Sequence, residues 1–187
     1  MKKNNPEPLK KEIEIFERMC RTNDALIENP KINSLLPMGA IITSEGNLEL
    51  FGLMFRNYEE KIRIKKSLFD KILSQKIKGY IVLLDAKMTK MDLEGKKCEV
   101  VDCMVRGLYT PQKTIKRFCF YKNHKILHEE NKKFQEKTEK MNMPSTDEWD
   151  LFNSSHFDDD DPELKKLNEI YQKFKKENPE KFKEVCK

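Results

Sequence analysis

The sequence predicts an α+β fold: an antiparallel sheet of about five or six strands, helices packed on one face of that sheet, and a C-terminal helical tail. Amphipathic segments with helical spacing occur near the start, in the middle and near the end of the 187-residue chain. Alternating or continuous apolar runs lie between them, joined by short turns that contain Gly, Asn or Pro. Strands that follow one another through short turns pair in antiparallel fashion, which gives the predicted sheet.

The first two predicted elements are a helix and a hairpin. Over residues 7–29, apolar side chains recur near helical spacing with Lys and Glu between them, and Asn29-Pro30 ends the helix. The segments "MGAIIT" and "NLELFGLMF" follow as the two strands of a hairpin. Gly46 and Asn47 lie between them and accept the positive φ that a tight turn requires.

A second helix and the remaining strands complete the predicted sheet domain. Residues 59–77, "EEKIRIKKSLFDKILSQKI", place apolar residues on one side and most lysines elsewhere. The run "YIVLL" at residues 80–84 is wholly apolar, which predicts a central strand buried on both faces. Further strands are expected over residues 97–109 and in "KTIKRFCFY" and "KILHEE", with turns between them.

The composition changes after residue 130, and the chain is therefore expected to have three parts. Residues 1–130 form the α+β core domain, residues 131–161 a polar and acidic linker without apolar periodicity, and residues 162–187 a C-terminal helix. Asp161 is the expected cap of that helix, and Pro162 suits its first position.

Charge is distributed unevenly along the chain. Residues 1–145 contain 29 Lys and Arg against 20 Asp and Glu, residues 146–163 contain none against 8, and residues 164–187 contain 8 against 4. The three segments thus carry +9, −8 and +4. A basic body with a separate acidic segment predicts an anionic partner for the body.

The acidic segment "EWDLFNSSHFDDDD", residues 148–161, is the first candidate binding site. Bulky apolar anchors among negative charges suit a hydrophobic groove rimmed by Lys or Arg. That groove belongs either to a protein partner or to the protein's own basic face, which the segment would then mask. The alternative is a solvated linker whose aromatic residues cover the edge of the core. The candidate binding residues in this segment are Trp149, Phe152, Phe157, Asp158, Asp159 and Asp160.

A second candidate site lies on the strand around residue 117, where basic and aromatic residues alternate. This mixture suits phosphate neutralisation together with base stacking, so nucleic acid is one candidate partner. The alternative is that the aromatic rings belong to the core. The basic candidates are Lys113, Lys116, Arg117 and Lys122.

A third cluster follows from the expected pairing of two long strands. With Glu94-Gly95 at the centre of the turn, Lys87 lies opposite Asp102 and Asp85 opposite Met104, all on one face of the sheet. Asp85 and Asp102 could then hold Mg²⁺, and Asp-Ala-Lys resembles the acid-x-lysine element of metal-dependent nucleases. The alternative is a set of cross-strand salt bridges.

Other classes of protein are excluded by what the sequence lacks. The N-terminus has no apolar signal region, and no apolar run approaches the ~18 residues that cross a bilayer. Five scattered cysteines predict reduced thiols and a cytoplasmic protein. His124 and His128, with Cys119 upstream, offer zinc ligands, but a fourth ligand is missing.

The sequence therefore predicts a non-enzymatic, intracellular binding or adaptor protein that needs no cofactor. Its basic face would take an anionic partner, and its acidic aromatic segment would bind a protein or mask that face. The alternative is a metal-dependent nuclease or phosphodiesterase that uses Asp85, Lys87 and Asp102, with Asp85 and Asp102 holding the metal. The sequence leaves the oligomeric state open.

Overall fold

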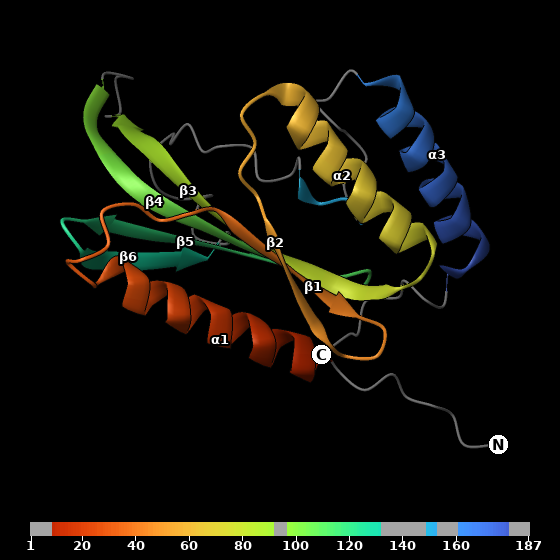
Figure 1. The fold of residues 1–187 in the computed structure, drawn as a ribbon, viewed down its shortest axis with the longest axis horizontal. Coiled ribbons are helices and arrows are strands. Elements are labelled where there is room, and N and C mark those ends of the chain that lie inside the picture. The colour runs from red at the N-terminus through yellow and green to blue at the C-terminus, as the bar shows by residue number, and fades with distance from the viewer. Residues whose placement is uncertain (1–8, 92–96, 132–148, 153–160, 180–187) are drawn as a thin grey trace.

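Three helices and six strands make up the computed structural model, which describes residues 9–91, 97–131, 149–152 and 161–179 (Figure 1). The helices are α1 (Lys10–Ile27), α2 (Tyr58–Leu73) and α3 (Pro162–Glu177). The strands are β1 (Met38–Thr43), β2 (Leu48–Gly52), β3 (Ile77–Met91), β4 (Lys97–Tyr109), β5 (Thr114–Lys122) and β6 (Lys125–Asn131). They form one antiparallel sheet in the order β2-β1-β3-β4-β5-β6, which confirms the predicted α+β class.

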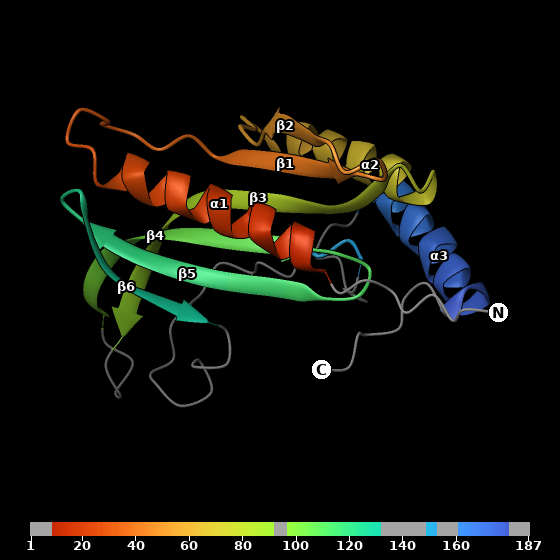
Figure 2. The same cartoon turned by 90° about the horizontal axis from the view of Figure 1, so that it is seen from below.

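The helices lie on both faces of the sheet, which differs from the expectation of a single covered face. Helix α1 packs on one face over Ile81 and Leu83, whereas α2 and α3 pack on the other, over Tyr80 and Val82 (Figure 2). The reason is the wholly apolar "YIVLL" run of β3, because a strand with two apolar faces needs cover on both. Within the described residues, no helix is both long and apolar enough to cross a bilayer.

The pairing of β3 with β4 follows the predicted register. Lys87 lies opposite Asp102, Asp85 opposite Met104, and Leu83 opposite Arg106. The alternation of side chains then places Asp85, Lys87, Asp102 and Arg106 on the face that α1 covers. The turn residues from which this register was predicted lie outside the described residues.

Helix α1 is held to its face by two arginines that rise from neighbouring strands. Arg106 is 1% exposed, forms an ion pair with Asp24 and donates a 3.0 Å hydrogen bond to Asn23 Oδ1. Arg117 donates to both carboxylate oxygens of Glu17, and this hydrogen bonding lowers the pKa of Glu17. Charge-assisted contacts thus fix the helix above the apolar part of this face.

Residues 149–152 form part of the core on the opposite face. Trp149, Leu151 and Phe152 are buried, and the hydroxyl of Tyr80 joins this short segment to β3. The hydroxyl donates to the Trp149 carbonyl at 2.5 Å and accepts from the Leu151 N–H at 2.8 Å. Burial raises the pKa of Tyr80 well above its usual value, so the hydroxyl keeps the proton that it donates. Asp150 accepts a 2.7 Å hydrogen bond from the Thr114 hydroxyl.

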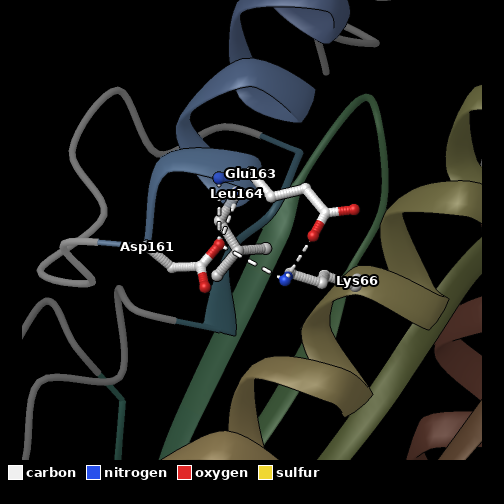
Figure 3. Close-up of polar contacts among 4 residues, drawn as sticks. All are labelled: Lys66, Asp161, Glu163 and Leu164. Atoms are coloured by element: carbon white, nitrogen blue, oxygen red, sulfur yellow. Dashed lines mark hydrogen bonds and ion pairs between the residues drawn. The ribbon is translucent and has the colours of Figure 1, made fainter.

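Helix α3 packs beside α2 and begins with the predicted cap. Asp161 accepts hydrogen bonds from the N–H groups of Glu163 and Leu164, and Pro162 starts the helix. Lys66 of α2 reaches across to this end, with its Nζ 3.4 Å from Asp161 and 2.6 Å from Glu163 (Figure 3). The final part of the segment that we expected to be a linker therefore docks on the domain that precedes it.

Replacing Tyr80 with Phe tests the attachment of residues 149–152. The substitution keeps the ring but removes the hydroxyl that bonds to both groups, so within the described residues the Trp149 carbonyl and the Leu151 N–H keep only their 3.1 Å hydrogen bond to each other. The free energy of unfolding should fall by about 1 to 2 kcal/mol. Urea unfolding followed by fluorescence measures this, because Trp149 is the single tryptophan of the chain. Ser67→Ala, which removes an exposed hydroxyl from α2, is the control and should not lower the free energy of unfolding, because Ala has the higher helix propensity. Equal effects of the two substitutions would contradict the attachment.

Candidate ligand-binding groove at the start of helix α2

A groove with a cavity volume of about 850 Å³ opens beside the first half of α2. The connection from β2 to α2 forms one wall, α2 forms another, and β3 and β4 contribute residues from the sheet. Most of the lining is apolar. The main apolar contributors are Leu53, Met54, Phe55, Ile64, Val105 and Trp149. A cavity of this size and character is typical of sites for small organic ligands.

The residues that cap α2 fix one wall of the groove. Asn57 caps the helix, and its side chain accepts a 2.9 Å hydrogen bond from the N–H of Glu60. The Glu60 carboxylate reaches back and accepts a 2.7 Å hydrogen bond from the N–H of Arg56. This reciprocal arrangement is a form of the capping box, and it holds Arg56 at the mouth of the groove.

Trp149 contributes its side chain to the lining of the groove. Its ring is 1% exposed, lies 6.2 Å from the ring of Phe55 and has the Lys65 ammonium 5.5 Å from its centroid. The indole Nε1 is buried and has no hydrogen-bond acceptor among the described residues. A buried donor without an acceptor costs about 1 to 3 kcal/mol.

Two arginines supply positive charge at the groove. Arg56 and Arg63 both line it and are exposed, and neither guanidinium forms a hydrogen bond or ion pair with the described part of the chain. The two acids that line the same groove are already engaged: Glu60 in the cap, and Asp85 by a 2.6 Å hydrogen bond from the Tyr121 hydroxyl. The groups left to meet a ligand are therefore cationic.

The rim of the groove exposes large apolar side chains. Met54 is 64% exposed and Phe55 is 38% exposed. Both lie between buried Leu53 and the capped start of α2. Exposed apolar groups that gather at the edge of a cavity are typical of binding sites. The arrangement as a whole suits a ligand that has an apolar body and a negative charge.

The predicted acidic aromatic site is divided by the structure. Trp149 and Phe152 are interior residues, as the alternative of aromatic residues covering the core anticipated, so in this conformation they are not presented to a protein partner. The reason is that Tyr80 and the apolar face of β3 offer them a better environment than water. Phe157, Asp158, Asp159 and Asp160 lie outside the described residues.

The predicted basic strand does not form one cationic surface. Lys116 is 6% exposed on the α2 face, whereas Arg117 points to the α1 face and binds Glu17. Lys113 lies in the turn before β5, and Lys122 lies at the other end of the strand. Successive residues of a strand point to opposite faces, which separates side chains that are adjacent in the sequence.

The cluster around Asp85 is brought together, as the register required. Asp85, Lys87 and Asp102 share one face, and Tyr121 joins them through its hydrogen bond to Asp85. Burial and the charge of Asp102 raise the pKa of Asp85, while Tyr121 and Lys87 act in the opposite direction. Within the described residues, no three His, Cys, Asp or Glu side chains are placed to hold a metal ion.

The groove itself was not predicted from the sequence. Its residues come from five separate segments, which are Pro37, residues 53–64, residues 84–86, Val105 and Trp149, and no local pattern joins them. One signal was available, because "RNYEE" places an arginine directly before a capped helix, where the helix dipole already favours anions. Comparison with family models, curated proteins and solved structures gives no match for this chain.

The pKa of Asp85 provides a test of the cluster. Tyr121→Phe removes a hydrogen bond to the ionised carboxylate and should raise this pKa further, whereas Asp102→Asn removes a nearby negative charge and should lower it. Carboxyl ¹³C NMR titration measures both shifts. Asp70→Asn, at an exposed acid of α2, is the control and should leave the Asp85 titration unchanged.

The same pKa determines how stability depends on pH. Because the folded-state pKa of Asp85 lies above its ordinary value, the folded protein binds this proton more tightly than the unfolded chain does. The resulting contribution to stability is complete below the ordinary pKa and is lost as the pH rises through the raised one. Asp85→Asn should remove this part of the pH dependence, and an unchanged dependence would contradict the assignment.

Proposed function

We propose that the chain is a non-enzymatic binding protein that takes up a small amphipathic anion in the groove at the start of α2. The ligand has an apolar chain or ring system and ends in a carboxylate. One observation carries the proposal: the guanidinium groups of Arg56 and Arg63 form no hydrogen bond or ion pair with the described residues, and both arginines line an apolar cavity of about 850 Å³. Arginine is suited to this role because its planar fork matches a carboxylate.

The apolar part of the groove supports a chain or ring rather than a simple ion. Each methylene group transferred from water into such an environment contributes about 0.8 kcal/mol. Met54 and Phe55, which are exposed at the rim, would be covered by the same ligand.

The distribution of the other cations supports a small anion over a nucleic acid. A nucleic acid needs a cationic surface that follows several phosphates. Lys116 and Arg117 point to opposite faces, and Arg117 is bound to Glu17. Binding of nucleic acid by this strand therefore has little support from the arrangement of its side chains.

The docking of α3 supports part of the self-masking hypothesis. Asp161 and Glu163 bind Lys66, so carboxylates of the chain's own acidic region already occupy one cation of α2. Arg56 and Arg63 lie nearer the start of the same helix and remain open. We therefore propose that the acidic region neutralises the lysine and leaves the arginines to define the ligand site.

Binding of dodecanoate tests this function. Titration followed by Trp149 fluorescence and by calorimetry should show saturable binding, and Arg56→Ala or Arg63→Ala should each weaken it about five- to tenfold, because each removes a charge-assisted contact. Arg18→Ala, at an exposed arginine of α1 on the opposite face, is the matched control and should bind as the wild type does. Dodecanol, which lacks the charge, should bind more weakly than dodecanoate.

Two results would overturn the proposal. The first is the absence of saturable binding of dodecanoate to the wild type. The second is equal affinity in the wild type and in the Arg56→Ala, Arg63→Ala double variant, since dodecanoate would then bind without the arginines. Circular dichroism of each variant distinguishes loss of binding from loss of the fold.

A metal-dependent nuclease or phosphodiesterase is the second candidate. The observation in its favour is the strand register, which places Asp85, Lys87 and Asp102 on one face. On this hypothesis Mg²⁺ or Mn²⁺ should raise the thermal midpoint of the wild type and leave that of Asp102→Ala unchanged, because ions that bind only the folded state stabilise it. Identical responses of the two proteins would remove this candidate.

A further inference from the structure

We infer that β2 pairs with β2 of a second copy of the chain, in an antiparallel arrangement centred on Leu50. The observations that support this interface do not include those that support the ligand groove. Strand β2 is the edge of the sheet, and within the described residues it pairs with β1 alone. An edge strand presents a row of backbone N–H and C=O groups to any strand that can approach it.

The hydrogen bonds at the two ends of the hairpin show which groups face outward. The Thr43 N–H donates to the Asn47 carbonyl at 2.9 Å, and the Leu53 N–H donates to the Pro37 carbonyl at 3.4 Å. Both bonds follow the register that pairs β1 with β2. Hydrogen-bonded and non-hydrogen-bonded pairs alternate along an antiparallel ladder, so the odd-numbered residues of β2 bond to β1. The even-numbered residues direct their N–H and C=O groups away from it. These outward residues are Leu48, Leu50 and Gly52.

The outward groups are self-complementary. With Leu50 opposite Leu50 of the second copy, Leu48 lies opposite Gly52 and Gly52 opposite Leu48. Every one of these pairs is of the hydrogen-bonded type, so all outward N–H and C=O groups of the three residues find partners. A register displaced by one residue would break this match. The backbone therefore favours a second copy of the same strand in one defined register.

The side chains on the α1 side of β2 agree with this pairing. Leu50 is 71% exposed and Leu48 is 44% exposed, which is unusual for strand residues beside buried Ala40 and Ile42. In the paired arrangement the two Leu50 side chains meet at the two-fold axis, and each Leu48 lies over the small Gly52 of the second copy. An exposed apolar strip on an edge strand would be covered in this way.

Charges on the α2 side also permit the pairing. Glu49 would lie opposite Phe51 of the second copy, so no like charges face each other directly. Each Glu49 is already neutralised by Lys71, whose Nζ lies 3.1 Å from its carboxylate. The interface therefore brings together no uncompensated charge.

The two edges of the sheet differ in the protection that their sequences provide. Natural edge strands commonly carry Lys, Pro or a bulge that prevents pairing. Strand β2 has none of these, and its register with β1 is continuous. The sequence of β6, "KILHEEN", contains a lysine and two glutamates instead. A two-fold pair through β2 alone is closed and does not continue into a polymer.

Sedimentation equilibrium tests the interface over about 10 to 500 µM protein. The wild type should rise from its monomer mass of 22.3 kDa towards twice that value with concentration, since a five-residue strand supports a small, reversible interface. Leu50→Lys should weaken the association at least tenfold. Leu127→Lys, at a 49% exposed leucine on β6, is the matched control and should associate as the wild type does.

Substitutions at Gly52 separate the backbone contribution from the apolar one. Gly52→Pro removes an outward N–H without removing a bond to β1, and it should also weaken association at least tenfold. Gly52→Ala keeps the N–H, and its methyl group meets no atom of its own chain within 4 Å, so this variant should still associate. Thermal unfolding confirms that both variants fold.

Cysteine cross-linking reports the register. In a background with Cys98 and Cys186 replaced by Ser, Leu50→Cys should form an intermolecular disulfide, because hydrogen-bonded pairs have Cα atoms about 5.5 Å apart. Leu48→Cys should not, since the two copies of residue 48 lie about four residues apart, roughly 13 Å. A wild type that stays monomeric throughout, or association that survives both Leu50→Lys and Gly52→Pro, would overturn the inference. Cross-linking through Leu48→Cys but not Leu50→Cys would overturn the register.

Discussion

The buried hydroxyl of Tyr80 is the contact on which the α2 side of the molecule depends. It donates to the Trp149 carbonyl and accepts from the Leu151 N–H, and so fixes a short segment that is 69 residues away in the sequence. The rings that this contact positions are part of the core into which Leu164 and Tyr171 of α3 also pack. Without this attachment, the groove would lose Trp149 and α3 would lose part of the surface on which it packs.

The charges of α2 show how one helix serves two purposes. Lys65 is buried beside Trp149, and Lys66 binds carboxylates at the start of α3, so both lysines hold the C-terminal part of the chain in place. Arg56 and Arg63 line the groove, and their guanidinium groups form no hydrogen bond or ion pair with the described part of the chain. The chain as a whole carries only +5, so position rather than the total charge decides which cations can meet a ligand.

Local patterns predicted the elements and one register, but not the contacts between distant segments. The pairing of Lys87 with Asp102 followed from a turn and from the alternation of strand side chains, both of which are local. The "YIVLL" run indicated burial on both faces, yet we expected helices on only one, because consecutive antiparallel strands do not show where each helix crosses. Trp149 and Phe152 lie in a segment whose polar composition resembles a linker, and only their contact with Tyr80 shows that they belong to the core. The groove needs five separate segments, so no window of the sequence contains it.

The connection after β2 relates the ligand groove to the edge of the sheet. Strand β2 ends at Gly52, and the next residues, Leu53 to Arg56, form the groove wall as far as the cap of α2. The wall is fixed at one end by the hydrogen bond from Leu53 to Pro37 and at the other by the bond from Arg56 to Glu60. Between these two bonds Met54 and Phe55 are exposed, so a ligand can cover them without displacing a buried side chain. A second copy paired with β2 would further restrain the end of the wall at Leu53. The wall would then have less conformational freedom to lose when a ligand binds.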